Sequence, residues 1–359
     1  MIWLATLAAC GGEEFGGAVA TAGGAGASGA GTSVGGQGAG GQGAGGQGDG
    51  GGGAGASAGG AAGGCLVPSR AMPPAAENEE VIAVTDEDQA QYPNLVGSHV
   101  YWTTPTSVWR VPKAGGCLER VATGGSALRG LAVQDGFAYF VDSAAGNVRR
   151  AAVGGGEESV VASDQPGVQT IALDAAHAYW AGPGILARTA LDGSGAVETL
   201  ASTDVEQAFA VAVDTSHAYW ATRSGSVHRV PKTGGASTLV DSSAGLVGTE
   251  PVYLTLFENR FYWSFRTQSS GGVRTKTKLG SQSSLSAISD PHAQGIAVDG
   301  QNAYWARAEA SGGIRKGPAG LGSVSEHVAG QSRPAGVAVD ATHVYWTNSG
   351  DASIRRSMK

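Results

Sequence analysis

The chain has 359 residues and a formal net charge of −7, and 61 of its residues are glycine. A chain with this negative charge offers no basic surface of the kind that binds nucleic acid, so we expect no nucleic-acid partner. The sequence also contains no glycine-rich phosphate loop, no His/Cys cluster with metal-ligand spacing and no nucleophile elbow. Sequence motifs therefore do not assign a reaction to this chain, and its internal repeats become the main source of information.

The chain begins with a short apolar stretch that ends in Leu7-Ala8-Ala9-Cys10. This ending resembles the lipobox of bacterial lipoproteins, in which the cysteine becomes the lipidated N-terminus. The resemblance implies a signal peptide over residues 1–10, lipidation of Cys10 and a cell-envelope location, as an outer-membrane or surface lipoprotein. The stretch is too short to span a bilayer and lacks the usual basic leader. A chance match, a start codon assigned too late and a secreted protein are the alternatives.

Residues 11–64 form a low-complexity tract in which 27 of the 54 residues are glycine. Such a segment cannot bury enough apolar surface to offset the entropy lost on folding, so we predict that it is disordered. A flexible glycine-rich chain of this length spans roughly 40 Å as a root-mean-square distance. A segment that contains proline and alanine follows up to Asn78. We therefore predict a disordered linker over residues 11–78 and a folded domain over residues 79–359.

Two cysteines remain once Cys10 is set aside, and both occur in the sequence Gly-Gly-Cys-Leu. In a secreted or envelope protein, an even number of cysteines indicates a disulfide framework. We expect a Cys65–Cys117 disulfide that fixes the end of the linker to the folded domain. Two free thiols are the alternative.

A motif of about ten residues, seen in Val337 to Trp346, recurs along the rest of the chain. A Tyr-Trp pair marks each copy, except that the second copy has Phe in place of Trp. The spacing between successive tyrosines is 38 to 43 residues, which is the length of one four-stranded propeller blade. The seven marker residues are Tyr101, Tyr139, Tyr179, Tyr219, Tyr262, Tyr304 and Tyr345. The spacing predicts an all-β fold, a seven-bladed β-propeller, with a six-bladed ring as the alternative.

Each copy reads as short β-branched runs separated by turn residues, which is typical of meandering antiparallel strands. The first strand alternates large and small residues, as in Ile171-Ala172-Leu173, and suits a position between neighbouring sheets. A small residue precedes this strand in five copies: Gly130, Thr170, Ala210, Gly295 and Gly336. We expect the innermost strands to crowd around a central axis, and the Tyr-Trp pairs to fill the space between blades.

Polar residues that recur in step with the repeat are interpreted as parts of the scaffold. An aspartate ends the first strand in four copies (Asp174, Asp214, Asp299 and Asp340) and is expected to accept hydrogen bonds from turn amides. The same interpretation covers four histidines that lie two residues before the tyrosine (His99, His177, His217 and His343). A catalytic or metal-binding role for these residues is the weaker alternative.

The ring is predicted to close through its two ends. The last copy lacks a fourth strand, whereas Glu79 to Thr85 aligns with the fourth-strand segment Val197 to Thr203 of another copy. The N-terminal strand should therefore complete the last blade, and closure removes free sheet edges.

The stretch Val344-Tyr345-Trp346-Thr347-Asn348 resembles the YWTD repeat of LDL-receptor-type propellers. That family has six blades, and its fourth motif residue, Asp, is never present here. The repeats also resemble those of the streptogramin lyases, which are seven-bladed propellers. The catalytic His and Glu of those lyases cannot be matched to residues of this chain. Both resemblances imply a propeller and leave its ligand open.

Candidate site residues come from the loops that run from the fourth strand of one blade to the first strand of the next. These loops break the repeat, and we expect them to meet at the mouth of the central channel. They carry Asp164, Glu206, Glu250, Asp290, His292 and Arg333. Several carboxylates around one mouth would suit a divalent cation or a cationic ligand, and His292 would add an acid–base group. A solvated polar rim is the alternative.

These observations favour a lipid-anchored propeller that acts as a binding or interaction module. We expect a monomer with a protein, peptide or glycan partner, and no organic cofactor. A metal-assisted lyase or lactone hydrolase at the channel mouth is the alternative, and a spacer without a ligand is the third. The fold alone does not decide which of these three functions is correct.

Overall fold

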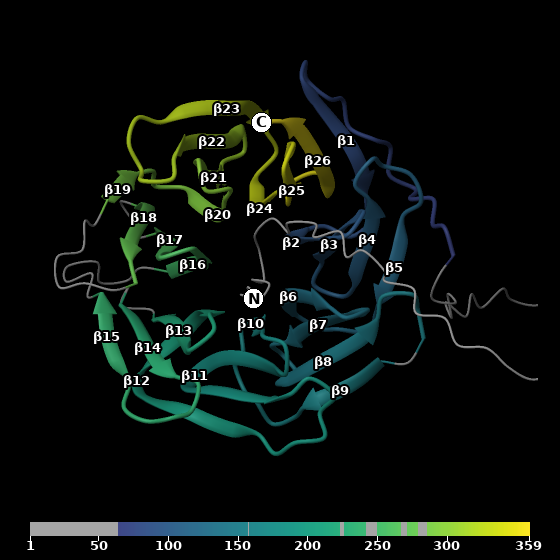
Figure 1. Ribbon diagram of the computed structural model, residues 1–359. Coiled ribbons are helices and arrows are strands. Elements are labelled where there is room, and N and C mark those ends of the chain that lie inside the picture. Colours follow the sequence, from purple (N-terminus) through teal and green to yellow (C-terminus); the bar gives the residue numbers. More distant parts are fainter. Residues whose placement is uncertain (1–63, 157, 223–225, 242–249, 267–270, 279–285) are drawn as a thin grey trace, which may run out of the picture. The chain divides into compact units, whose positions relative to one another are not determined.

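The computed structural model describes residues 64–156, 158–222, 226–241, 250–266, 271–278 and 286–359. The regular elements of these ranges are strands, and they form a seven-bladed β-propeller (Figure 1). The predicted fold class and blade number are confirmed, and the six-bladed alternative is wrong. Among the described residues, no helix has the length and apolar character needed to cross a membrane.

The first two blades are antiparallel meanders, with strands in chain order from the centre of the ring outwards. The first blade contains β2 (Gln91–Val96), β3 (His99–Thr103), β4 (Val108–Pro112) and β5 (Glu119–Ala122). The second contains β6 (Leu128–Gln134), β7 (Phe137–Asp142), β8 (Asn147–Ala152) and β9 (Glu158–Ala162).

The third and fourth blades share a long strand, so their hydrogen bonding forms one six-stranded sheet. The strands are β10 (Thr170–Leu173), β11 (His177–Ala190), β12 (Glu198–Val213), β13 (His217–Thr222), β14 (Val227–Pro231) and β15 (Thr238–Asp241). The first part of β12 pairs with β11 and its last part pairs with β13. One continuous strand therefore serves as the outer edge of one blade and the inner strand of the next.

The fifth and sixth blades repeat the meander of the first two. The fifth contains β16 (Glu250–Phe257), β17 (Arg260–Arg266), β18 (Gly271–Thr277) and β19 (Ser286–Ser289). The sixth contains β20 (Ala293–Val298), β21 (Asn302–Arg307), β22 (Gly312–Pro318) and β23 (Ser325–Gln331).

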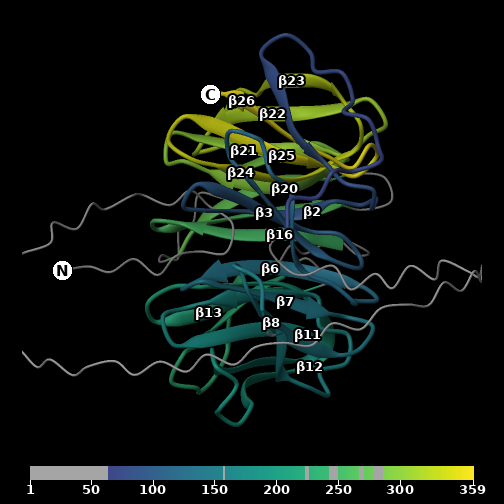
Figure 2. The same cartoon turned by 90° about the vertical axis from the view of Figure 1, so that its right-hand side faces the viewer.

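The seventh blade joins the two ends of the propeller, as predicted. Its inner strands are β24 (Pro334–Val339), β25 (His343–Asn348) and β26 (Ser353–Met358), and its outer strand is β1 (Glu79–Val84). Strand β1 pairs antiparallel with β26, with Glu79 opposite Ser357 and Val84 opposite Ser353. A view turned by 90° shows this blade beside the sixth (Figure 2), and β20 and β24 are in contact.

A buried ion pair lies at this closure. Arg355 and Glu79 meet at 2.5 Å, and their side chains are 6% and 2% exposed. The Gln331 amide donates a second hydrogen bond to Glu79 at 2.8 Å. Arg355 also donates to the Pro74 carbonyl and pairs with Asp351. Because each buried charge has several partners, the closure is fixed by polar contacts as well as by strand pairing.

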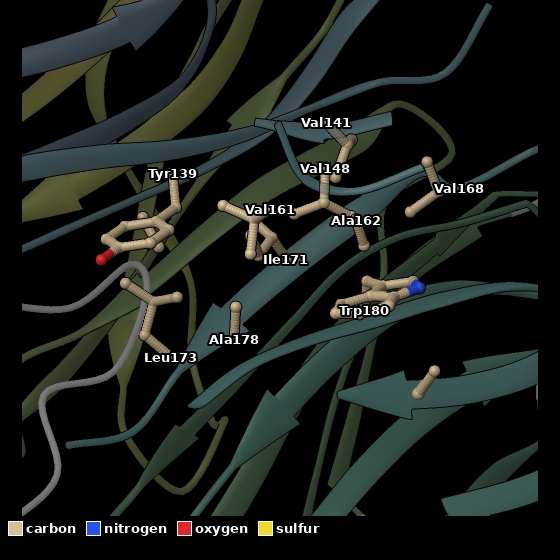
Figure 3. Packing of buried hydrophobic residues seen from close by; sticks show 12 residues of the cluster. Tyr139, Val141, Val148, Val161, Ala162, Val168, Ile171, Leu173, Ala178 and Trp180 are labelled. Carbon is tan, nitrogen blue, oxygen red and sulfur yellow. The ribbon is translucent and has the colours of Figure 1, made fainter. Parts of the chain in front are cut away.

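The core of the described ring consists of seven clusters of buried side chains, each between two neighbouring blades. Figure 3 shows the cluster between the second and third blades, where Tyr139 and Val141 of β7 face Leu173 and Trp180 of the third blade. Each cluster has the tyrosine of one blade and the aromatic partner residue of the next. Consecutive strand residues point to opposite faces, so each Tyr-Trp pair packs against two different neighbours. The predicted role of these pairs is confirmed.

Candidate functional site at the loop face

The alternating strand directions give the ring two unlike faces. Short hairpins that connect the first to the second strand, and the third to the fourth, lie on what we call the turn face. The connections between second and third strands, and between successive blades, lie on the opposite loop face. Four of the six sequence-predicted site residues lie in loop-face connections between blades: Asp164, Asp290, His292 and Arg333. Glu250 is the first residue of β16, and Glu206 lies inside β12, where the third blade continues into the fourth.

A repeated contact holds the turn face together. The Tyr179 hydroxyl donates to Asp174 at 2.7 Å, and Lys232 of the next blade reaches the same carboxylate at 2.8 Å. Turn amides bind its other oxygen. The equivalent cross-blade ion pairs are Lys278–Asp214, Lys359–Asp299 and Lys113–Asp340. The recurring aspartates thus accept turn hydrogen bonds, as the sequence predicts, and also tie neighbouring blades together.

These carboxylates are held in the ionised state. Burial alone would raise the pKa of Asp214, but two turn amides, the Tyr219 hydroxyl and Lys278 outweigh burial and lower the pKa to about 2. At Asp340 two turn amides and Lys113 likewise outweigh burial and lower the pKa to about 2. Burial, followed by the nearby Asp340 carboxylate, raises the pKa of Tyr345 to about 12. Each shift has a structural cause that repeats with the blades, so it marks the scaffold.

Asp290 is one of the predicted site residues, and the structure gives it a structural contact. It is buried, and it accepts the indole N–H of Trp305 at 2.9 Å. Gln165 and Gln331 accept the indoles of Trp180 and Trp346 in the same way, each from a position 15 residues before its Trp. Asp290 is therefore part of a repeated anchor for the core Trp. The common spacing is visible in the sequence and could have revealed this contact.

His292 and Arg333 lie near each other, on the loops of the sixth and seventh blades. The His292 Nε2 atom lies 3.6 Å from the Glu309 carboxylate, and both side chains are partly exposed. The Arg333 amide donates to the Glu309 carbonyl at 3.0 Å, and the Arg307 guanidinium lies 3.8 Å from its carboxylate. Sequence reasoning missed Glu309, although it lies in a second-to-third-strand connection that departs from the repeat.

The other predicted residues are not brought into this group. Asp164 is exposed in the loop between the second and third blades, with a φ angle of 58°. The side chains of Glu206 and Glu250 lie outside the described part of the structure. Among the described residues, no three His, Cys, Asp or Glu side chains gather as metal ligands would. A cation site formed by these carboxylates stays a prediction.

Two further residues near the centre of the ring were also missed. Tyr92 of β2 and Tyr253 of β16 come from the first and fifth blades, and their ring centroids lie 5.4 Å apart. The inner strands surround a common axis (Figure 1), so these two rings meet across that axis. The sequence signal was their shared position nine residues before the marker Tyr, where the other five copies have a small residue.

The segment that precedes the propeller contacts it on the turn face. Cys65 is bonded to Cys117 in the hairpin between β4 and β5, with Cα atoms 5.1 Å apart. The Leu66 amide donates to the Leu118 carbonyl at 2.8 Å, and Ser69 donates to Asp86. The last part of the predicted linker therefore contacts the first blade. Cys10 and the glycine-rich tract lie outside the described residues.

Comparison with known proteins shows the fold and no family. No family model and no curated protein matches the chain. Catalytically inactive virginiamycin B lyase from Staphylococcus aureus, solved with quinupristin, has a TM-score of 0.62 at 12% identity over 78% of this chain and 99% of that one. Nup159, solved bound to Dbp5 of S. cerevisiae, has a TM-score of 0.54 at 10% identity over 78% and 93%. BamB from Moraxella catarrhalis has a TM-score of 0.52 at 13% identity over 73% and 82%.

Proposed function

We propose that this protein is a lipid-anchored propeller of the cell envelope that binds a protein, peptide or glycan through its loop face. The observation that carries the proposal is the distribution of repeated contacts. The Asp–Tyr–Lys contacts recur around the turn face, whereas the exposed polar residues of the loop face differ from blade to blade. Residues that do not serve the repeat are free to serve recognition.

The attachment of the chain supports this orientation. The Cys65–Cys117 disulfide places the start of the described chain at the turn face. The first described residues of the chain are therefore fixed to the face opposite the loop face. Lipidation of Cys10 would hold such a protein at a membrane through the spacer, by the anchor chemistry of lipoproteins.

A binding experiment with matched variants tests the role of the loop face. Full-length protein is incubated with an envelope fraction of its own organism, and the bound material is quantified. Asp164 and Arg333 are exposed loop-face residues with positive φ angles, and Asp135 and Glu258 are their turn-face counterparts. We expect Asn substitution of the first pair to reduce binding at least tenfold and of the second pair to leave it unchanged. Equal effects of the two pairs would refute the proposal.

Membrane attachment is tested separately. The Cys10→Ser variant should appear in the soluble fraction, whereas the wild-type protein should sediment with membranes. A Cys65→Ser variant controls for the loss of a cysteine, because it removes the disulfide without touching the lipidation motif. Sedimentation of the Cys10→Ser variant with membranes would contradict lipid anchoring.

A second candidate is a metal-assisted lyase or lactone hydrolase at the channel mouth, and the observation that favours it is the His292–Glu309 pair. A carboxylate 3.6 Å from an imidazole can orient the ring and stabilise its protonated form during acid–base catalysis. Thermal-shift measurements with divalent cations test this candidate, since a ligand of the folded state raises Tm. A rise that His292→Gln abolishes would favour the enzyme. Unchanged Tm values with all cations would count against metal assistance.

A further inference from the structure

The pairing between the first and second strands is irregular at the same level in most blades. Pairing with the second strand shifts between Gln91 and Asn94 in β2, and between Arg129 and Leu131 in β6. Similar irregularities occur in β12, β16, β20 and β24. A β-bulge re-aims the side chains beside it, and bulges are frequent next to binding sites. The bulges therefore lie at one level of the central channel, close to the loop-face ends of the inner strands.

The first and second blades share a left-handed backbone at this level, and the first blade has tyrosine where the second has glycine. Gly130 has a φ angle of 45° at the position that corresponds to Tyr92, whose φ angle is 52°. A residue with a Cβ atom pays about 1–2 kcal/mol for this left-handed conformation. Backbone strain of this kind persists where the side chain has a role. The Tyr92 ring is therefore placed against Tyr253 at a measurable expense in stability.

The inner strands of neighbouring blades also lie close together at this level. A Cβ atom added to Gly336 would lie 2.1 Å from the Pro93 side chain, and one added to Gly295 would lie 2.6 Å from the Gly336 Cα atom. The small residues let the inner strands of neighbouring blades approach closely. The two tyrosine rings therefore meet on the axis of the ring, near the loop-face ends of the inner strands.

In several blades a polar residue occupies the strand position just before that of the two tyrosines. Arg129 is one residue before Gly130 on the inner strand of the second blade, and its side chain is exposed. Burial raises the pKa of the Tyr92 hydroxyl, and the positive charge of Arg129 partly offsets that rise. Within the described residues Arg129 has no ion-pair partner. Half-buried glutamines have the same position, ten residues before the marker tyrosine, in three other blades: Gln91, Gln169 and Gln294.

These groups match one class of ligand. A guanidinium can bind a carboxylate through two parallel hydrogen bonds. Glutamine amides both donate and accept, as hydroxyl groups require, and the tyrosine rings offer flat apolar surface. A cationic ligand, in contrast, would meet the like charge of Arg129. The axial groups therefore favour an anion rather than the cation considered from the sequence.

We propose that Tyr92, Tyr253 and Arg129 form an axial binding site for a uronic acid residue of an acidic glycan, with Arg129 on the carboxylate. This inference rests on the proposed function, because it names the ligand class of the loop face. The site is distinct from the His292–Glu309 pair, which lies on the connections of the sixth blade.

The test is isothermal titration of the full-length protein with a galacturonic acid trisaccharide and with the neutral galactose trisaccharide of the same linkage. We expect the acidic sugar to bind at least tenfold more tightly. The Arg129→Gln variant should lose at least tenfold in affinity for the acidic sugar and keep its weak affinity for the neutral one. Arg129→Lys should fall between them, since it keeps the charge and loses the planar fork.

Controls separate binding from folding. Arg70→Gln removes one positive charge from the exposed pair with Asp88, so it should leave the affinity unchanged. The Tm of each variant shows whether it is folded. Equal binding of both sugars, no binding of either, or full binding by folded Arg129→Gln would overturn the axial site. The envelope-binding experiment with Asp164 and Arg333 variants reports on the proposed function independently, so it can succeed when the axial site fails.

Discussion

The turn face and the loop face are formed by the same seven repeats, yet they differ in what they repeat. On the turn face, a carboxylate, a phenol and an ammonium group meet at Asp174, and equivalent ion pairs occur at three other blade interfaces. On the loop face, the buried anchors of the core Trp side chains recur, but the exposed polar side chains differ from blade to blade. Repetition identifies residues that hold the ring, and departures from it identify residues that the ring does not need.

Among the variants that test this comparison, those at the closure of the ring should have the largest effect on stability. Arg355→Ala leaves Glu79 buried without its cation, and we expect a loss of about 3–5 kcal/mol in the free energy of unfolding. Arg356→Ala is the matched control, because its partner Glu80 is 61% exposed and such pairs contribute about 1 kcal/mol or less. Denaturant titration of both variants measures the difference, and equal losses would contradict a special role for the buried pair.

The turn-face aspartates should give the next largest effect, and it should depend on pH. The folded pKa of Asp214 is about 2, below its ordinary value of 3.8. Its contribution is therefore complete above pH 4 and is lost as the pH falls from about 4 to about 2. Asp214→Asn should remove about 2 kcal/mol at pH 7 and make stability less dependent on pH in this window. Asp135→Asn, on an exposed turn, should keep the wild-type profile.

Substitution by glycine should change the stability of the protein by different amounts at the two axial tyrosines. Tyr92→Gly relieves the positive φ angle and loses the ring contact, so we expect a net change within about 1 kcal/mol. Tyr253→Gly loses the same contact and has no such strain to relieve, so it should destabilise the protein more. Chemical denaturation of the two variants decides the matter. A larger loss in Tyr92→Gly would mean that its backbone is not strained.

The smallest effect is expected at the loop face. His292→Gln removes an exposed pair whose side chains are 48% and 41% exposed, and we expect a change below about 0.5 kcal/mol in the free energy of unfolding. The thermal midpoint of the variant should match that of the wild type in low and high salt. A salt-dependent loss of stability would place His292 among the structural residues.

Much of the fold could be predicted because the repeat imposes it. The seven Tyr markers fixed the blade number, and the missing last strand pointed to Glu79–Val84 as its replacement. Contacts across the ring could not be predicted, since Tyr92 and Tyr253 are neighbours only when blades one and five face each other. The cross-blade partners of the aspartates were missed for a similar reason. They depend on which side of a blade its neighbour covers, and no spacing within one repeat contains that information.

The pairing of β1 with β26 has a consequence for how the molecule is made. Glu79 and Arg355 are separated by 276 positions, so the first strand of the ring has no partner until the last residues have been synthesised. Contacts of such long range are slow to form, and incomplete sheets expose edges that promote aggregation. Most of the blades can assemble while the chain emerges, but β1 must wait as a single extended strand. A chain truncated before β26 would remain an open ring, and quality control in the cell would meet it in that state.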